Sequence, residues 1–437
     1  MPIFIAVLVL LCSTLPAISQ TTPQNPVPPA NYDEAKVGTY TLPDPLVFKD
    51  GKPVRTASDW GKRRPEILEL FADNFFGRSA EARKMRYEVF DEDRHALGGK
   101  AIRRQVTIYF SGRKGFSGRK DKDKAKDKAG PTEDLLIYLP AQAKGPVPLI
   151  LALNFNGNQA VVSDPAVRLP SVWNRQTHQP ESATEASRGT DTQFEVEKVI
   201  ARGYGFATVY YQQIEPDFPD GWKYGVRQLF LNRPPRDSEW GAIGAWAYGL
   251  SRAMDYLEQD KGVDSKRVAI MGHSRLGKTV LWAGALDVRF AMVIANCPGE
   301  GGASLVRRNY GETIASMTRG KFGYWFAPKL AEFGDRVEQL PVDMHELIAL
   351  MAPRPVYVTG AVDDQWADPK GEFLACVAAG PVFRLLGAQD LGTDQMPEVN
   401  QPVIHTIAYH IRDGKHDVLP FDWEQYLKFM GMHFAPK

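Results

Sequence analysis

The chain has 437 residues, 43% of them apolar, so it can bury a large core, and α/β folds with insertions reach this length as one unit. Its 53 lysines and arginines nearly balance its 52 aspartates and glutamates, for a net charge of +1. This balance argues against a nucleic-acid or polyanion binder and favours a small molecule or a carbohydrate as partner.

The N-terminal segment is typical of a secretory signal. Residues 3–11 form an apolar run, and small residues follow at the place of a cleavage site. We expect residues 1–19 to be a signal peptide and the protein to be secreted or periplasmic. No Lys or Arg precedes the run, so a buried N-terminal strand is the alternative. Residues 20–40, rich in Thr, Pro, Gln and Asn, predict a flexible segment before the main domain at 41–437. No other stretch approaches the length of a membrane span.

The hydrophobic pattern then predicts alternating strands and helices. Helices are expected at residues 61–74, 194–202, 241–260, 279–286, 343–350 and 423–433. Strands are expected at residues 85–90, 101–110, 135–139, 149–153, 206–211, 266–270, 290–295, 356–360 and 402–411. Strands that alternate with helices in this order indicate a mostly parallel sheet with right-handed crossovers and helices on its faces.

A basic insertion interrupts the early strands. Residues 113–128 hold eight basic and three acidic residues and almost no apolar ones. We interpret about 112–133 as a solvated loop between two strands, with a docking site for acidic polymers as the alternative.

Two cysteines remain after the expected cleavage, Cys297 and Cys376. They could pair, but spacing alone cannot show it, and we expect both to be free and buried. No Cys/His cluster has the spacing of a zinc site, so we expect neither a metal nor another cofactor.

A serine lies at a turn between a strand and a helix. Ser274 stands between Gly272 and Gly277 in the pattern Gly-x-Ser-x-x-Gly, one residue longer than the nucleophile elbow of hydrolases. A sharp turn needs glycine where strand and helix approach closely. Such a turn exposes the hydroxyl and aims backbone N–H groups at the same place. The alternative is an ordinary Gly-Ser loop.

A serine hydroxyl needs a base to take its proton and a carboxylate to orient that base. In α/β-hydrolases these partners follow in the order Ser, acid, His. His345 falls inside a helix, and His405 and His410 fall within a strand with apolar neighbours. His416 lies in a polar loop after the last strand, so we select it as the base, with a plain surface histidine as the alternative. His273, beside the serine, is expected to pack behind the turn.

The acid is expected in the loop after strand 356–360. Asp363 and Asp364 lie there, and we select Asp364, while Asp368 before Pro369 is typical of a helix cap. The polar loop at 154–159 follows another buried strand and is expected beside the nucleophile. Together these features predict an α/β-hydrolase fold, a three-layer sandwich.

Four spaced motifs carry a resemblance to a known family. The segments 272–278, 298–302, 307–313 and 364–369 together resemble the glucuronoyl esterases of carbohydrate esterase family 15. The resemblance implies hydrolysis, through an acyl-enzyme and without a metal, of the ester that joins glucuronic or 4-O-methylglucuronic acid on xylan to lignin alcohols. We expect the protein to act as a monomer.

The resemblance also implies roles for residues around the serine. Arg275 would place its guanidinium and its backbone N–H near the oxyanion, the alternative being an exposed arginine at the helix start. Lys278 would donate to the sugar hydroxyls. Glu312 and Trp366 would complete the sugar pocket, although Glu312 could equally be structural.

One position departs from the fungal members. They carry the acid in the loop where this chain has Cys297, and a thiol cannot replace a carboxylate there. Some bacterial members place the acid later, which supports Asp364, with Glu300 in reserve. The rival functions are an acetyl-xylan or other carbohydrate deacetylase on the same fold and a non-catalytic xylan-binding module.

Overall fold

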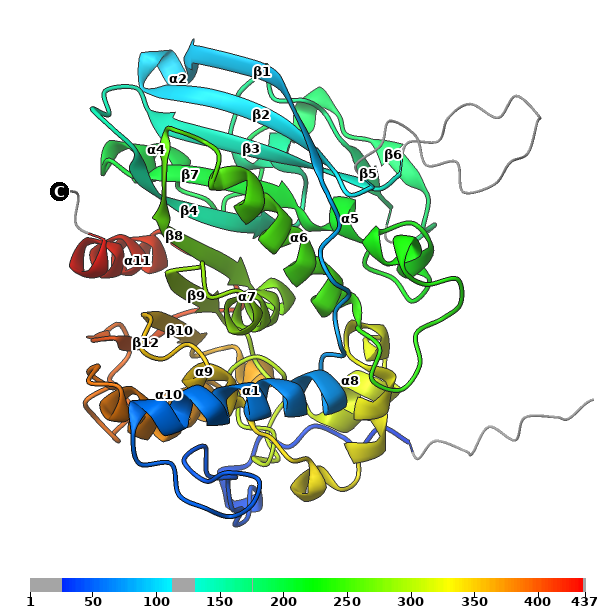
Figure 1. Cartoon of the computed structure of the whole chain (residues 1–437), viewed down its shortest axis with the longest axis vertical. Helices are drawn as coiled ribbons and strands as arrows, with labels where there is room; N and C mark the ends of the chain where they lie inside the picture. The colour runs from blue at the N-terminus through cyan, green and yellow to red at the C-terminus, as the bar shows by residue number, and fades with distance from the viewer. Residues whose placement is uncertain (1–25, 112–129, 175, 435–437) are drawn as a thin grey trace, which may run out of the picture.

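The computed structural model describes residues 26–111, 130–174 and 176–434 (Figure 1). The expected signal peptide and the basic stretch 113–128 lie outside these residues. No helix of the described ranges is long and apolar enough to cross a lipid bilayer.

A ten-stranded sheet in the order β1-β2-β3-β7-β4-β8-β9-β10-β12-β11 forms the centre of the fold (Figure 1). Neighbours from β7 to β12 pair in parallel, whereas β1, β2, β3 and β11 are antiparallel to their neighbours. The strands are β1 (Arg86–His95), β2 (Ala101–Tyr109), β3 (Thr132–Pro140), β4 (Val147–Asn154), β7 (Gly205–Tyr210), β8 (Val263–His273), β9 (Met292–Asn296), β10 (Val356–Ala361), β11 (Val403–Ile404) and β12 (Ile407–Arg412), and β5 (Ser171–Trp173) pairs separately with β6 (Pro180–Ser182).

Helices cover both faces of this sheet. One core contains residues of α1 (Ala57–Asn74), α6 (Ala242–Leu257), α7 (Arg275–Leu286), α9 (Met344–Ala349) and α10 (Pro369–Leu385), and the other contains residues of α4 (Val196–Ala201) and α11 (Pro420–His433). The shorter helices are α2 (Ala96–Gly99), α3 (Asn158–Val161), α5 (Tyr211–Ile214) and α8 (Ile314–Arg319).

Strand β4 shows why both faces are apolar. Its Leu149 and Leu151 point into the first core, while Ile150 and Ala152 point into the second. Successive side chains of a strand alternate between faces, so a strand buried on both sides is a continuous apolar run. The predicted three-layer α/β-hydrolase fold is confirmed.

Three expectations about elements need correction. The sequence pattern missed α10, a helix of 17 residues in which Gly371, Gly380 and Pro381 interrupt the apolar periodicity. The expected strand 402–411 is two strands, β11 and β12, and His405 lies between them rather than within a strand. The expected loop at 112–133 ends earlier, because β3 begins at Thr132.

Residues 31–34, within the expected flexible segment 20–40, contact the main domain. Asn31 donates from Nδ2 to the carbonyl of Asn309 at 2.7 Å, and its own carbonyl accepts from Gly311 at 2.8 Å. Glu34 pairs with Arg308. These contacts place residues 31–34 against the loop that carries Arg308.

Two long connections rise from the same end of the sheet. One runs from β7 to α6, through residues 211–241, and the other from β9 to α9, through residues 297–343. The loops after β8, β10 and β12 end at this edge too, because parallel strands present their carboxyl ends together, which is where α/β proteins form their sites.

Candidate active site

Ser274 forms the sharp junction between β8 and α7. Its backbone has φ 58° and ψ −127°, a conformation that side-chain-bearing residues rarely adopt and that costs on the order of 1–3 kcal/mol. A Cβ on Gly272 would lie 2.1 Å from the carbonyl oxygen of Leu276, so only glycine fits there. Strained serine turns of this kind expose the hydroxyl above the sheet. The predicted tight turn is confirmed, although α7 begins at Arg275, four residues before the expected start.

His416 and Asp364 meet beside this turn. His416 Nδ1 lies 2.5 Å from Asp364 Oδ2. The aspartate side chain is buried, with 6% exposed, whereas the imidazole is 40% exposed and can reach a substrate. Ser274, Asp364 and His416 line one cavity of about 320 Å³. The structure therefore brings together the three residues selected from separate parts of the sequence.

Two of the other histidines considered as bases, His345 and His410, have structural contacts. His345 Nε2 lies 2.8 Å from the carbonyl oxygen of Pro43, and His410 lies between the Tyr357 hydroxyl and the Asp422 carboxylate. His345 and His410 are both buried, and neither lines the cavity of Ser274.

His273 is buried beside the turn and lines a hollow together with Ser274 and His416. Its ring centroid lies 4.4 Å from that of His416, and Nδ1 lies 2.7 Å from Oδ1 of Asn296. Asn296 Nδ2 in turn donates to the Tyr426 hydroxyl at 2.7 Å. Burial, and after it the neighbouring His416, lowers the pKa of His273 to about 3. His273 is therefore neutral at physiological pH and adds no charge beneath the base.

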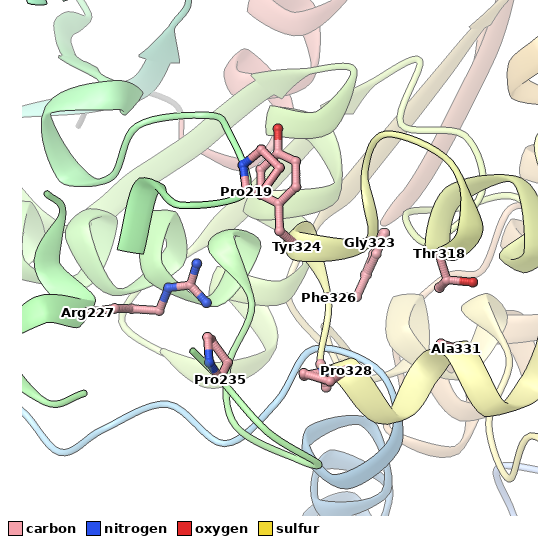
Figure 2. Close-up of a pocket in the computed structure, with 10 residues that line it drawn as sticks. Pro219, Arg227, Pro235, Thr318, Gly323, Tyr324, Phe326, Pro328 and Ala331 are labelled. Atoms are coloured by element: carbon pink, nitrogen blue, oxygen red, sulfur yellow. The ribbon is translucent and has the colours of Figure 1, made fainter. Parts of the chain in front are cut away.

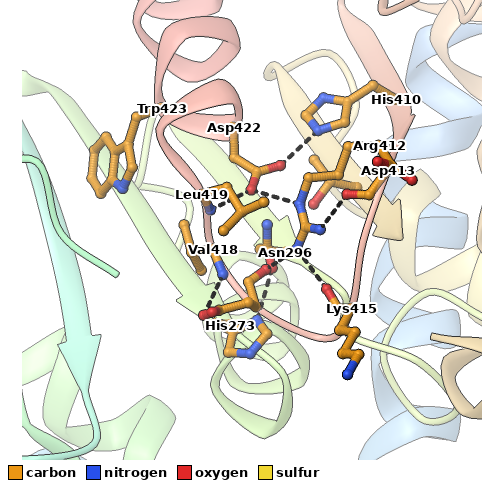
Figure 3. Close-up of polar contacts among 12 residues, drawn as sticks. His273, Asn296, His410, Arg412, Asp413, Lys415, Val418, Leu419, Asp422 and Trp423 are labelled. Carbon is orange, nitrogen blue, oxygen red and sulfur yellow. Dashed lines mark hydrogen bonds and ion pairs between the residues drawn. The ribbon is translucent and has the colours of Figure 1, made fainter. Parts of the chain in front are cut away.

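A buried arginine holds the loop that carries His416 (Figure 3). Arg412, the last residue of β12, donates from Nη1 to the carbonyl of Asp413 at 3.0 Å and from Nη2 to that of Lys415 at 2.9 Å. Nη2 also donates to the carbonyl of Asp417. One guanidinium thus fixes three carbonyls around His416.

Asp422 at the start of α11 anchors this arginine (Figure 3). Its Oδ2 accepts from Arg412 Nε at 2.9 Å and from the backbone N–H of Leu419 at 2.7 Å. Its Oδ1 lies 2.8 Å from His410 Nε2. Arg412 and Asp422 are fully buried, so each needs the other to compensate for lost hydration.

Arg275, directly after the serine, is held by Asp217 from the β7–α6 connection. Its Nη1 donates to Asp217 Oδ2 at 2.5 Å. The same carboxylate accepts from the hydroxyls of Tyr211 and Tyr324 and from Nε1 of Trp325, at 2.7, 2.7 and 2.8 Å. Burial would lower the pKa of Arg275, but Asp217 outweighs burial and raises it. The guanidinium is a fixed cation in a prearranged orientation.

Aromatic rings flank this guanidinium. Its carbon lies 4.8 Å from the ring centroid of Trp325 and 5.6 Å from that of Phe155. Phe155 belongs to the loop after β4, and with Asn156 it lines a hollow shared by Ser274 and His416. The loop at 154–159 therefore lies beside the serine, as expected.

Lys278, Glu312 and Trp366 line the same cavity. Lys278 is buried, and its Nζ donates to the carbonyls of Pro298 and Glu300 and to Oε2 of Glu312, at 2.8, 2.6 and 2.8 Å. A lysine has three donors, so all of them have partners here. Trp366 is 42% exposed and forms part of the rim.

Cys297 directly follows β9 and lines the cavity. Its Sγ, a ring nitrogen of His416 and a carboxylate oxygen of Asp364 all lie within 4.8 Å of one another. Cys297 and Cys376 are both free and buried, as predicted. Burial raises the pKa of the Cys297 thiol well above its ordinary range, so this side chain is a neutral thiol.

Glu300, kept in reserve as the acid, has a different position. Only its carbonyl takes part in the site, as an acceptor for Lys278. Its carboxyl group is fully buried, and burial raises its pKa well above the ordinary value. The acid that contacts His416 is Asp364.

Figure 2 shows a separate pocket that Tyr324 lines. It is lined by Pro219, Tyr324 and Phe326, among others, and shares no lining residue with the cavity of Ser274. Tyr324 connects the two regions, because its ring lines this pocket while its hydroxyl donates to Asp217.

The sequence pattern missed Asp217, Arg412 and Asp422 as parts of the site. Asp217 lies in a long excursion rich in aromatic residues and proline, and length alone was a signal that the excursion covers a site. Arg412 and Asp422 gave no signal, because an arginine at a strand end and an aspartate at a helix start are common.

Comparisons with known proteins agree with this geometry. A family model described as glucuronyl esterase, fungi, matches residues 200–387. The curated protein carbohydrate esterase MZ0003, from an unknown prokaryotic organism, is 45% identical over 416 residues, which cover 93% of this chain and 92% of that protein.

Two solved structures are similar over nearly the whole chain. A glucuronoyl esterase from Solibacter usitatus is 48% identical with a TM-score of 0.85, over 92% of this chain and all of that one (100%). A promiscuous CE15 esterase from a marine bacterial metagenome is 44% identical with a TM-score of 0.83, over 93% and 100% of the two chains.

Proposed function

The chain belongs to the glucuronoyl esterases of carbohydrate esterase family 15, and from that premise we propose that it hydrolyses the ester between a glucuronic acid of xylan and an alcohol of lignin. The acid is glucuronic acid or its 4-O-methyl ether. The observation that carries the proposal is the contact between His416 and Asp364 beside the strained turn of Ser274.

The first half of the reaction forms an acyl-enzyme. Ser274 Oγ attacks the ester carbonyl carbon while Nε2 of His416 takes its proton. Asp364 accepts the hydrogen bond from Nδ1–H, which holds the lone pair on Nε2 toward the serine and stabilises the imidazolium. The tetrahedral intermediate then collapses, His416 gives the proton to the departing alcohol oxygen, and the uronoyl group remains on Ser274.

Arg275 stabilises the oxyanion in both tetrahedral intermediates. Its guanidinium is fixed by Asp217 before substrate arrives, so little reorganisation is needed when charge develops on the carbonyl oxygen. Its backbone N–H, at the first residue of α7, adds a second donor. In the second half of the reaction His416 takes a proton from a water that attacks the acyl carbon, and it gives this proton to Ser274 Oγ when the second intermediate collapses and the free uronic acid is released.

The sugar ring is held by Trp366, Glu312 and Lys278. The exposed indole offers an apolar face to the pyranose ring, and Glu312 accepts hydrogen bonds from the hydroxyls. Because all three donors of Lys278 already have partners, Lys278 either positions Glu312 or exchanges one carbonyl for a sugar oxygen. The lysine and the glutamate therefore act as a pair.

A pair of assays tests the reaction. Benzyl glucuronate and acetylated xylan are offered separately to the wild type and to Ser274→Ala. We expect turnover of the glucuronate by the wild type, no turnover by the variant, and retained sugar binding by the variant. Activity on acetate esters alone would make the protein a deacetylase, and binding without turnover by the wild type would make it a xylan-binding module.

Export and a monomeric state complete the proposal. The apolar run at residues 3–11 supports export. The mass of the N-terminal peptide, measured on protein produced in a secreting host, tests cleavage after residue 19. Light scattering tests the monomer, and a dimer at micromolar concentration would contradict it.

A further inference from the structure

Three potential metal ligands of different chemistry meet in the cavity that Ser274 lines. Cys297 follows β9, Asp364 follows β10, and His416 follows β12, so three neighbouring parallel strands deliver them to one place. One ligand atom from each side chain lies within 4.8 Å of the other two. Because the three residues lie far apart in the sequence, a search for the spacing of metal ligands could not find this cluster.

We propose that Cys297, Asp364 and His416 form a binding site for one thiophilic divalent cation such as Zn²⁺, and that the bound cation switches the catalytic base off. The inference rests on the proposed role of His416. Zinc prefers thiolate, imidazole and carboxylate ligands in a tetrahedral arrangement, and this cluster supplies one of each.

The geometry needs only small movements. Zinc bonds of about 2.0–2.3 Å place the ligand atoms of a tetrahedral site about 3–4 Å apart. Side-chain rotation within the loops can bring atoms that already lie within 4.8 Å into this range. All three residues line the cavity, which gives the cation an entry path. We expect a water to complete the tetrahedral arrangement.

Other charges at the cavity do not prevent cation binding. Arg275 and Lys278 also line it, but Arg275 is paired with Asp217 and Lys278 with Glu312. Asp364 forms its contact with His416 rather than with either cation. Among the described residues, no lysine or arginine forms an ion pair with the Asp364 carboxylate. Its negative charge is therefore available to a divalent cation.

Binding removes the basic nitrogen. The cation bonds to the Cys297 sulfur, and the thiol proton leaves to solvent. It also bonds to Nδ1 of neutral His416, whose single ring proton then stands on Nε2. Nε2 is now a donor and cannot take the proton of Ser274. No electron is transferred, and a chelator reverses each step.

Inhibition of ester hydrolysis by Zn²⁺ gives the first test. Each variant is compared with its own rate without zinc, because Cys297 lies close to the base. We expect Zn²⁺ to inhibit the wild type reversibly and Cys297→Ser to need at least about tenfold more zinc, since a serine hydroxyl is a much poorer zinc ligand. The matched control is Cys376→Ser, which removes the other described thiol, and it should respond as the wild type. Mg²⁺ should not inhibit, because it prefers oxygen ligands.

A spectroscopic test does not depend on activity. Co²⁺ added to Ser274→Ala should give the near-ultraviolet charge-transfer band of a thiolate-bound cobalt ion, and Ser274→Ala/Cys297→Ser should not. A band that persists without Cys297, or equal zinc inhibition of wild type and Cys297→Ser, would overturn the proposal. If the wild type hydrolyses no uronate ester but the band appears as expected, the proposed function fails and the cation site stands.

Discussion

His416 Nδ1 and Asp364 Oδ2 lie 2.5 Å apart although 52 residues separate them in the chain. The contact joins the loops after β10 and β12, two parallel strands that are direct neighbours in the sheet. A slip in the pairing of these strands would separate base and acid. The sheet register is therefore part of the proposed catalytic apparatus.

Asp364→Asn should lower kcat by roughly 10³–10⁴-fold with little change of KM, because an amide neither fixes the Nδ1–H tautomer nor stabilises the imidazolium. The neighbouring variant Asp363→Asn is the matched control, since Asp363 is exposed, and it should retain near wild-type rates. Steady-state kinetics on benzyl glucuronate measure both. Equal losses in the two variants would remove Asp364 from its assigned role.

Asp217→Asn should reduce kcat by about 10–100-fold, because Arg275 loses its charged partner and the prearranged orientation that favours the oxyanion. Asp220→Asn lies on the same connection, is exposed, and pairs with exposed Lys223, so it serves as the control. A change in KM alone for Asp217→Asn would indicate a role in substrate binding instead.

Arg412→Lys should lower kcat about tenfold, because a single ammonium cannot hold three carbonyls of the His416 loop and Asp422 together. Arg412→Met should in addition cost about 3–5 kcal/mol of folding free energy, since it leaves Asp422 buried without its cation. Kinetics and urea unfolding separate the two effects. An unchanged kcat in a folded Arg412→Lys protein would show that the His416 loop keeps its conformation without the guanidinium.

Acidification should destabilise the protein through His273. Its folded pKa of about 3 lies below the ordinary 6.5, so between these values the unfolded chain binds a proton that the folded protein does not. The contribution of His273 to the free energy of unfolding is fully present well above pH 6.5. It decreases as the pH falls, by about 1.4 kcal/mol between pH 7.5 and 5.5.

Urea unfolding of the wild type and of His273→Gln at the two pH values isolates this contribution, because all other titrating groups are common to both proteins. The wild type should lose more stability on acidification by about that amount. Equal losses would mean that His273 is protonated in the folded protein.

The sequence predicted those parts of the fold that depend on local pattern. The buried strands and the turn at Ser274 followed from apolar runs, periodicity and glycine positions, and His416 and Asp364 followed from the order of strands. Helix α10 escaped because glycine and proline lower its intrinsic helix propensity, while burial against the sheet stabilises it.

Contacts between segments that are far apart in the chain could not be predicted from the sequence. Asp217 is recognisable only when the β7–α6 connection folds over Arg275, and Arg412 only when its guanidinium meets three carbonyls of the next loop. The gathering of Cys297 with Asp364 and His416 likewise depends on strand order in space. Residue type and spacing do not encode such geometry.

The central claim is that Ser274 is the nucleophile and that His416 and Asp364 activate it. Its most direct test is the rate and site of labelling by a fluorophosphonate, measured by mass spectrometry of the digested protein. We predict one adduct, on the peptide that carries Ser274, formed at least about 10³-fold more slowly in Asp364→Asn. Labelling of a different residue, or an enzyme still fully active on benzyl glucuronate after complete labelling of Ser274, would contradict the account.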